Sequence, residues 1–254
     1  MNWLRHHLLL ALVVGGAILL ASAGADARQL RAIAEAFPTI AEMAPDGSLH
    51  GVGVEIVQQV AARLGMPISI TIIPWGRSLA QMQHGDADIL IGPYPTPERA
   101  AYMDFSADAI YRAKVVLFAP ADKQIAWTGD FRALQGLRIG TTLAWYYGAK
   151  FNDHQAALIL DPTVHQPDAF RMLMRGRVDL VITTESAGQA AVGELGIAGL
   201  VTELSPPVDI LEGHIGFAKS PDMLAVRQAF DRELAALVAD GTVARLNQKY
   251  GRFY

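Results

Sequence analysis

Cysteine is absent from the 254-residue chain. Its absence excludes disulfide bonds, catalysis by a thiolate and metal sites with thiolate ligands, and it also excludes a lipid-anchored cysteine behind an export signal. Histidine is sparse, with seven residues that show no metal-ligand spacing. We therefore expect neither a metal ion nor a cofactor.

Positive charge is also scarce. The chain has 21 Lys and Arg residues against 25 Asp and Glu residues, which gives a formal net charge of −4 at pH 7, and its basic residues form no run. Nucleic acids and anionic membranes attract basic surfaces, so we expect neither as a partner. The composition indicates a soluble, mildly acidic protein.

Long hydrophobic runs are missing except at the amino terminus. The uncharged apolar segment Leu8–Leu20 has 13 residues, fewer than the roughly 20 that a membrane-spanning helix needs, and two glycines interrupt it. Arg5 precedes this segment, and small residues lead from it to Ala25-Asp26-Ala27, an A-x-A cleavage pattern. We therefore predict a cleaved secretory signal peptide over residues 1–27 and a periplasmic location. Cleavage after Ala23 and an uncleaved anchor are the alternatives.

One pattern of residues occurs twice, at positions 79–91 and 170–182. Each copy has helical spacing that stops at a glycine, Gly85 or Gly176, and continues after an aspartate with three residues that favour strands. Glycine is favoured just past a helix because it readily adopts left-handed backbone angles, and a continuous apolar run is typical of a strand buried on both faces. The pattern predicts an α/β unit that is used twice. Chance repetition of a common arrangement is the alternative.

Two α/β units in one chain indicate two α/β lobes. Ligands of open α/β sheets bind beyond the carboxyl ends of the strands. The residues that follow the two predicted strands, Gly92–Tyr94 and Thr183–Glu185, are therefore expected to face a shared cleft.

The chain is expected to cross between the lobes twice. Val115–Phe118 is an apolar strand that leads into a Pro-containing turn, and His214–Lys219 is a second strand that is followed by Ser-Pro-Asp. We interpret both strands as crossings. Lobe 1 then comprises residues 28–118 and 215–254, and lobe 2 comprises residues 119–214.

Short motifs in a fixed order carry a resemblance to a known family. In chain order they are Leu49–Ile56, Gly85–Asp88, Thr96–Arg99, Asp104–Ser106, Gly136–Gly140, Gly176–Asp179 and Ala239–Thr242. Behind a signal peptide, this order resembles that of the family 3 extracellular solute-binding proteins, which are periplasmic receptors that deliver polar amino acids to ABC importers. The match covers nearly the whole chain after residue 27.

The resemblance implies the type II periplasmic-binding-protein fold. In that fold two α/β lobes, joined by two crossover strands, close on a ligand in the cleft between them. The resemblance also implies a small-molecule ligand, a monomeric receptor, a membrane permease of an ABC importer as partner, and binding without catalysis.

The resemblance gives Arg99 the central contact with the ligand. This residue ends the Thr96-Pro97-Glu98-Arg99 motif, where the family has the arginine that clamps the α-carboxylate of an amino acid. A guanidinium suits a carboxylate in a dry cleft because it donates two parallel hydrogen bonds. The alternative is a surface ion pair of Arg99 with Glu98 or Asp104.

Aromatic residues are expected to wall the ligand. Phe37 lies where the family places an aromatic residue on the ligand, and Trp75 lies where relatives cover the ligand's side chain. Tyr94 follows the first predicted strand of the repeated unit. A Trp ring can also stack on a cation, while core packing of Trp75 is the alternative. Arg77 is either a second contact for an anion or a surface charge.

In lobe 2, Trp145 and Tyr146 lie where the family has a Gly-Thr-Thr segment that opens a helix. Backbone N–H groups at such a helix start favour an anion, so this turn and Arg99 could hold one carboxylate between them. Family members place an aspartate for the ligand's ammonium group after the second buried strand, whereas this chain has Thr184 there and Glu185 next to it. An ammonium contact is then expected only from Glu185, and the ligand is an amino acid or a related carboxylate without a free ammonium.

Two other functions share the predicted fold. A few periplasmic dehydratases that act on cyclohexadienyl acids use it, and such chemistry needs a placed general acid. Glu185, Glu55 and Glu35 are the candidates, and none matches a catalytic pattern. A sensor or accessory protein would use the same cleft and closure to present its ligand to a membrane partner. The sequence favours a binding protein over an enzyme, but it does not distinguish a sensor from a transport receptor, because both use the same cleft and closure.

Overall fold

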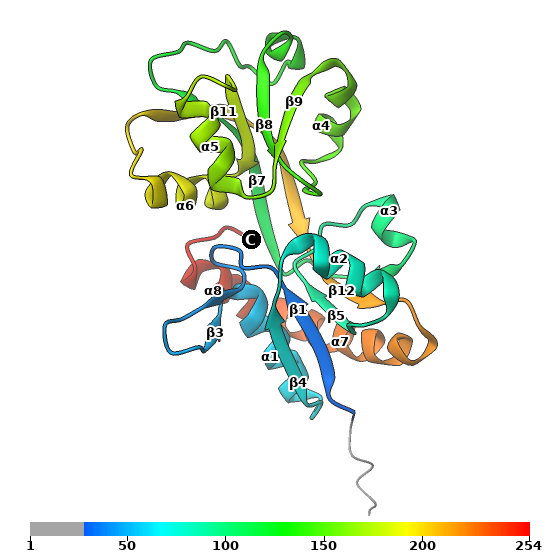
Figure 1. Ribbon diagram of the computed structural model, residues 1–254. Coiled ribbons are helices and arrows are strands. Elements are labelled where there is room, and N and C mark those ends of the chain that lie inside the picture. Colours follow the sequence, from blue (N-terminus) through cyan, green and yellow to red (C-terminus); the bar gives the residue numbers. More distant parts are fainter. Residues whose placement is uncertain (1–27) are drawn as a thin grey trace, which may run out of the picture.

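The computed structural model describes residues 28–254, in which two lobes of α/β structure lie one above the other (Figure 1). The predicted signal peptide and its cleavage sites lie outside these residues. Two five-stranded sheets and a two-stranded hairpin make up the strand structure of this part of the chain. Within residues 28–254, no helix combines the length and the apolar character that crossing a membrane requires.

The first lobe is a mostly parallel sheet covered by helices. Its strands are β1 (Leu30–Ala34), β4 (Ile68–Ile72), β5 (Ile89–Ile91), β6 (Met103–Phe105) and β12 (Ile215–Ala218), and its hairpin pairs β2 (Glu42–Met43) with β3 (Leu49–His50). Its helices are α1 (Val52–Arg63), α2 (Trp75–His84), α3 (Pro97–Ala100), α7 (Pro221–Ala239) and α8 (Thr242–Lys249). The strand order is β4-β1-β5-β12-β6. Because β1 is parallel to β4 and β5, the carboxyl ends of these three strands meet at one edge.

The second lobe repeats this plan with a different order of strands. Its strands are β7 (Tyr111–Pro120), β8 (Arg138–Thr142), β9 (Ile159–Thr163), β10 (Leu180–Thr184) and β11 (Val201–Gly213). Its helices are α4 (Ala149–His154), α5 (Gln166–Met174) and α6 (Glu185–Leu195), with the 3₁₀ turns η1 (Phe131–Leu134) and η2 (Gln155–Ala157). The strand order is β11-β7-β10-β8-β9, and β10, β8 and β9 are parallel.

The unit that the sequence predicts twice is present in both lobes. It consists of α2 followed by β5 in the first lobe and of α5 followed by β10 in the second. Gly85 and Gly176 lie just past the two helices with φ of 76° and 64°, the left-handed region that favours glycine. Local sequence therefore determines where these helices end and where the buried strands begin.

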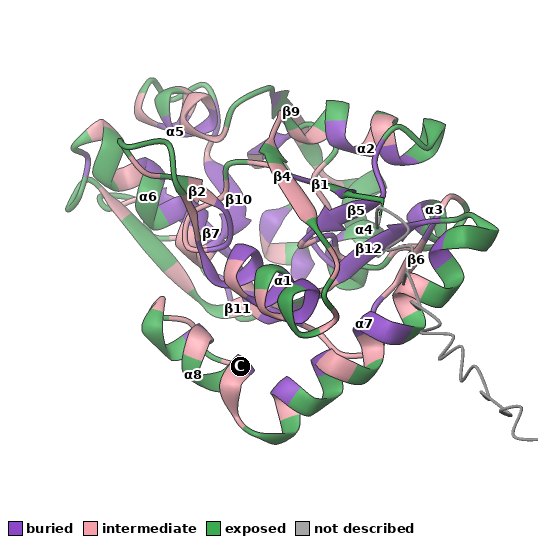
Figure 2. Ribbon diagram, turned by 90° about the horizontal axis from the view of Figure 1, so that it is seen from below, coloured by how far each residue is buried: buried purple, intermediate pink, exposed green. Residues whose placement is uncertain are grey.

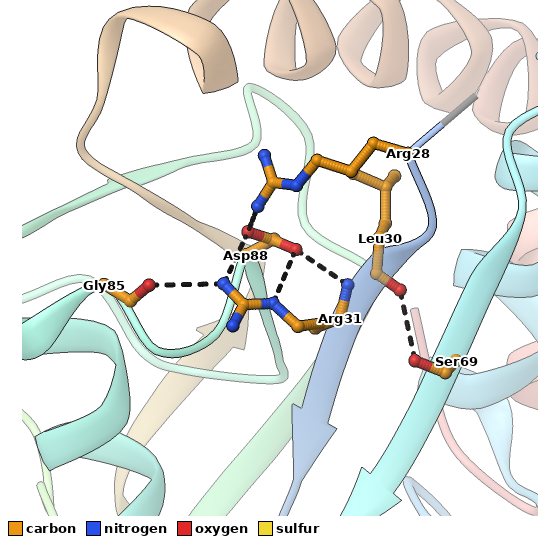
Figure 3. Close-up of polar contacts among 6 residues, drawn as sticks. All are labelled: Arg28, Leu30, Arg31, Ser69, Gly85 and Asp88. Carbon is orange, nitrogen blue, oxygen red and sulfur yellow. Dashed lines mark hydrogen bonds and ion pairs between the residues drawn. The ribbon is translucent and has the colours of Figure 1, made fainter. Parts of the chain in front are cut away.

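An aspartate ties each unit to the neighbouring strand. Asp88 accepts hydrogen bonds from the backbone N–H of Arg31 at 2.8 Å and from its guanidinium at 3.2 Å and 3.3 Å (Figure 3). In the second lobe, Asp179 accepts from the backbone N–H of Arg138 at 3.0 Å and from its guanidinium at 3.3 Å. Each guanidinium also donates to the carbonyl of the glycine that ends the helix. The two units thus have the same arrangement of hydrogen bonds as well as the same sequence pattern.

Two long antiparallel strands join the lobes. β7 and β11 pair from Tyr111 opposite Gly213 to Pro120 opposite Val201, with one irregularity in the register. The start of β7 packs in the core of the first lobe, whereas the part from Val115 onward packs in the second lobe and pairs with β10. The two strands therefore form the connection through which the lobes can move relative to each other.

The crossings differ in place from those expected from the sequence. The boundary expected at residue 118 falls inside β7, and His214–Lys219, interpreted as a crossing, contains β12 of the first lobe's sheet. The core contacts of β7 favour a boundary between the lobes near residue 113 instead. The second expected boundary, at residues 214–215, coincides with the start of β12. An apolar run indicates a buried strand, but the sheet that it joins depends on partners distant in the sequence.

Each lobe has its own hydrophobic core. Figure 2 shows buried residues gathered on β5 and β12 and within α1 and α7. In the first lobe, the rings of Phe217 and Phe230 lie 5.5 Å apart between their centroids. In the second lobe, one cluster around Phe151 and another around Phe170 cover opposite faces of the sheet. Two separately packed lobes leave the space between them available for a ligand.

Candidate functional site

A cavity between the lobes gathers most of the residues predicted to bind a ligand. It encloses about 460 Å³ of space between protein atoms, part of which is open to solvent. The lining residues are Glu35, Phe37, Ile40, Trp75, Gly92, Tyr94, Arg99, Tyr111, Trp145, Tyr146 and Thr184.

The cavity lies where strand ends from the two sheets converge. Glu35 and Gly92 directly follow β1 and β5, and Trp75 follows β4 after a two-residue turn. In the second lobe, Trp145 follows β8 and Thr184 ends β10. The cavity therefore occupies the position beyond the carboxyl ends of the strands at which open α/β sheets bind their ligands.

Arg99 is a buried cation in the wall of this cavity. Only 5% of its surface is exposed. One terminal nitrogen donates to the backbone carbonyl of Tyr94 at 2.9 Å, the other donates to the carbonyl of Ala144 at 3.3 Å, and the guanidinium carbon lies 5.1 Å from the centroid of the Trp75 ring. The turn Thr96-Pro97 presents this side chain, because the Thr96 hydroxyl accepts the backbone N–H of Arg99 and so caps α3.

The Arg99 guanidinium has no carboxylate within 4.0 Å among residues 28–254, so the ion pairs considered with Glu98 and Asp104 are not formed. Burial lowers the pKa of Arg99, but a guanidinium keeps its proton at neutral pH. A buried charge without a counter-ion is costly, and an anionic ligand would supply the missing charge.

The turn after β8 contacts the first lobe across the cavity. The carbonyl of Ala144 accepts from the indole N–H of Trp75 at 3.1 Å as well as from Arg99. Ala144 has φ of 61°, a left-handed conformation that few residues other than glycine adopt, and this conformation turns its carbonyl toward the first lobe. The rings of Phe37 and Trp145 also meet across the gap, 5.5 Å apart between centroids. The lobes are thus closed against each other.

Glu35 is a carboxylate of the cavity that the sequence offered only as a catalytic candidate. Burial raises the pKa of the Glu35 carboxyl to about 7, although a hydrogen bond from the backbone N–H of Trp75 opposes the shift. No other carboxylate lines the cavity within the described part of the chain. Its position directly after β1 is the signal that could have identified it.

Two tyrosines complete the wall of the cavity. Tyr111, at the start of β7, donates its hydroxyl to the carbonyl of Gly92 at 2.7 Å. The Tyr94 ring lies 6.2 Å from that of Tyr111, and burial raises the pKa of both phenols. A side-chain hydrogen bond with Tyr111 partly opposes the rise in the pKa of Tyr94.

Thr184 and Glu185 are adjacent in sequence but lie on different sides of the second lobe. Thr184 is buried, lines the cavity and caps α6 by accepting the backbone N–H of Ala187 at 3.4 Å. Glu185 does not line the cavity; it faces a separate hollow near the carboxyl terminus, where it pairs with Lys114 at 3.2 Å. The predicted ammonium contact from Glu185 is therefore not supported by the placement of its side chain.

Arg77 is also absent from the cavity wall. It is exposed on α2, the helix that begins with Trp75, so its placement is that of the surface charge considered as the alternative. Within residues 28–254, no group of three or more His, Asp or Glu side chains is arranged to hold a metal ion.

Comparison with known proteins agrees with this architecture. Residues 31–253 match the family described as bacterial extracellular solute-binding proteins, family 3. The chain belongs to this family. The family resemblance predicted from the ordered motifs is thereby confirmed.

Individual relatives extend over most of the chain. L-cystine-binding protein TcyJ of Escherichia coli strain K12 is 23% identical over 215 residues, which are 84% of this chain and 79% of that protein. A histidine kinase sensor domain with similarity to periplasmic binding proteins has a TM-score of 0.77 at 19% identity, covering 90% of this chain and 99% of its own. The ancestral amino acid-binding protein AncCDT-1, a precursor of cyclohexadienyl dehydratase, has a TM-score of 0.69 at 19% identity, covering 87% and 94%. These likenesses confirm the predicted type II fold of two lobes.

Proposed function

We propose that this family 3 protein is a periplasmic receptor that captures an amino acid or a related small carboxylate by closing its lobes and delivers it to an ABC importer. The observation that carries the proposal is Arg99, a buried guanidinium in the interlobe cavity with no carboxylate partner among the described residues. The name of the L-cystine-binding relative adds support for an amino acid as ligand.

The ligand's carboxylate binds Arg99 and displaces part of its contact with the Ala144 carbonyl. Phe37, Trp75, Tyr94, Trp145 and Tyr146 wall the body of the ligand. Burial in this closed space strengthens the pairing of the carboxylate with the guanidinium, because little water remains to compete for either charge.

Glu35 takes the ligand's ammonium group. It lines the cavity, whereas Glu185 is turned away and already paired with Lys114. An ammonium beside Glu35 would offset the burial that keeps this carboxyl protonated up to about pH 7. Thr184 then acts as a wall and helix cap rather than as a replacement for the family's aspartate.

A thermal-shift screen of the protein against amino acids, amines, dicarboxylates and aromatic acids tests this function. A ligand that binds only the folded state raises the melting temperature. We expect a rise with at least one amino acid, and a smaller rise with the corresponding amine that lacks the carboxylate. A rise with the amine alone, or no rise with any amino acid, would contradict the proposal.

Two other functions have a specific observation in their favour. The likeness to a histidine kinase sensor domain supports a sensor, which would bind a kinase or another signalling protein in place of a permease. Co-purification of the ligand-bound protein from membranes distinguishes these partners. The raised pKa of Glu35 in the cavity wall suits a general acid, and a dehydratase precursor has a similar fold. Formation of product from prephenate or arogenate would identify an enzyme.

A further inference from the structure

A second cavity lies directly beside the ligand cavity. It encloses about 680 Å³ of space between protein atoms and is partly open to solvent. Three of its lining residues, Glu35, Phe37 and Trp145, also line the first cavity. Its remaining wall comes largely from the second lobe: the ends of β8 and β9, the beginning of α5, and one face of α6 that includes Glu194. We call it the outer chamber, and the ligand cavity the inner chamber.

Phe37 and Trp145 separate the two chambers. Phe37 belongs to the first lobe and Trp145 to the second, and their rings lie 5.5 Å apart between centroids with 39° between the ring planes. Both rings are only partly buried, and the space beside them on either side is hollow. Rotation of one aromatic side chain would therefore join the chambers, since neither ring is held by surrounding atoms on all sides.

The outer chamber contains a polar group whose hydrogen bonds are incomplete. The Gln166 side-chain carbonyl accepts the hydroxyl of Thr142 at 2.7 Å. Its amide nitrogen is buried and donates to no atom of residues 28–254. Thr142 is itself fixed, because its backbone N–H donates to the Tyr147 hydroxyl at 2.6 Å. Buried donors are nearly always paired, so an unpaired one in a residue that lines a cavity marks a place where a ligand or a water molecule supplies the acceptor.

We propose that the ligand is elongated and occupies both chambers. This inference rests on the proposed function, because the carboxylate end remains on Arg99 in the inner chamber. The chain of the ligand passes between Phe37 and Trp145, and its far end places a carbonyl or carboxylate oxygen on the Gln166 amide nitrogen. Such a ligand is an amino acid whose long side chain ends in a second amino-acid or amide group.

The chemistry of the partition agrees with this ligand class. Aromatic faces contact an apolar or sulfur-containing chain favourably, and they exclude water from the narrow part of the site. Glu35 lines both chambers, so it can face an ammonium group at either end of such a ligand. A short amino acid would fill the inner chamber and leave Gln166 without its acceptor.

Calorimetric titration with two thioethers tests the proposal. L-Cystathionine has an amino-acid group at each end, whereas S-methyl-L-cysteine has the same thioether but only one amino-acid group. We expect L-cystathionine to bind at least about tenfold more tightly than S-methyl-L-cysteine, because only the longer compound reaches the outer chamber. Equal affinities in the wild-type protein would overturn the proposal.

Variants of Gln166 assign the difference to the outer chamber. Gln166→Ala should bring the affinity for L-cystathionine close to that for S-methyl-L-cysteine and leave the latter unchanged. Gln166→Glu keeps the size of the side chain, removes the donor and adds a negative charge that repels the far carboxylate of L-cystathionine. It should lower the affinity at least as much as Gln166→Ala does, which would show that lost packing is not the cause. The control is Gln189→Ala, since Gln189 is exposed on α6 outside both chambers. Retention of the full preference in both Gln166 variants would overturn the proposal.

Failure of this inference can be told apart from failure of the receptor function. If other amino acids bind but L-cystathionine does not bind more tightly than S-methyl-L-cysteine, the two-chamber site is wrong and the receptor function stands. If no amino acid of any length binds, both proposals are wrong.

Discussion

Arg99 and Arg77 are two arginines of the same lobe with opposite surroundings. Arg99 is buried in the cavity wall and contacts two backbone carbonyls and an indole ring, whereas Arg77 is exposed on α2. A guanidinium contributes to binding of an anion mainly where water is excluded. The two residues therefore form a matched pair for testing the site.

Arg99→Ala should weaken binding of the amino acid identified by thermal shift by roughly tenfold or more, which is about 1.4 kcal/mol. The carboxylate loses its buried counter-ion, and the remaining donors are weaker. Arg77→Ala should leave the affinity unchanged. Calorimetric titration of both variants measures the effect, and equal affinities in Arg99→Ala and the wild type would remove the central contact of the site.

Glu35 makes binding depend on pH. Burial raises its pKa to about 7 in the free protein, so the carboxyl is largely protonated below that pH. An ammonium group beside it favours the ionised form, and binding below about pH 7 therefore releases a proton. We expect the affinity for an amino acid to increase as the pH rises from about 5 to about 8. Titration in two buffers with different ionisation enthalpies measures the released proton.

The variant Glu35→Gln provides the control, because it should bind with little dependence on pH over the same range.

The Glu35 carboxyl also affects the stability of the free protein. A carboxyl whose pKa is raised from 4.5 to about 7 on folding lowers stability as the pH rises through this window, since the unfolded chain ionises first. Glu35→Gln should remove this loss of stability, which urea unfolding at several pH values measures. If the stability of the variant depends on pH as that of the wild type does, the assigned pKa is wrong.

At the scale of elements, the helix and strand of each repeated unit are fixed by an aspartate. The pKa of Asp88 is lowered, because hydrogen bonds and charge from Arg31 outweigh the effect of burial, and the same holds for Asp179 with Arg138 and Lys123. The Asp88 side chain is 3% exposed and the Asp179 side chain 17%. The bonds of the first unit are therefore better shielded from water.

Asp88→Asn should lower the free energy of unfolding by about 1.5–3 kcal/mol at pH 7, the range for hydrogen bonds to charged groups, and Asp179→Asn should have a smaller effect. A lowered pKa stabilises the fold above the ordinary pKa of an aspartate, and this contribution is lost as the pH falls through the lower, folded-state value. The difference between Asp88→Asn and wild type should therefore shrink in acid. Urea unfolding measures this, with exposed Asp153→Asn as a control that should have no effect at either pH.

At the scale of the whole molecule, the carboxyl-terminal segment links the two lobes through Arg252. The Arg252 guanidinium donates to the Thr39 hydroxyl at 2.9 Å in the first lobe and to the Ser186 hydroxyl at 3.2 Å in the second. It also donates to the carbonyl of Arg112 in β7 and lies over the Tyr111 ring at 4.8 Å from its centroid. One side chain thus holds both lobes and the strand that joins them.

Arg252→Ala should shift the free protein toward an open arrangement, because the bond to Ser186 exists only while the lobes are closed. We expect a larger radius of gyration by X-ray scattering without ligand and the wild-type value with ligand. Affinity should decrease several-fold, since the ligand must then also supply the energy of closure. Arg245→Ala, which loses contacts only around the start of α8, is the control. An unchanged radius without ligand would show that Arg252 does not control closure.

The amino-acid sequence is enough to predict the repeated α/β unit, the membership in the family and therefore the two-lobed fold. These features depend on local spacing, on glycines past helix ends and on motifs in a fixed order. The sequence also indicated where most of the cavity wall would come from, because Tyr94 and Thr184 follow or end buried strands and the carboxyl ends of such strands converge. Phe37, Trp75 and Arg99 came from the resemblance and line the same cavity.

The direction in which individual side chains point depends on the folded structure. Thr184 and Glu185 are neighbours, but the helix that starts between them turns the Glu185 carboxylate away from the cavity, where Lys114 pairs with it. The tertiary structure also placed β7 in the second sheet and made Glu35 the carboxylate of the cavity. Pattern and propensity act over a few residues, whereas burial, partner strands and the pKa of a carboxyl depend on atoms that folding brings together from distant parts of the chain.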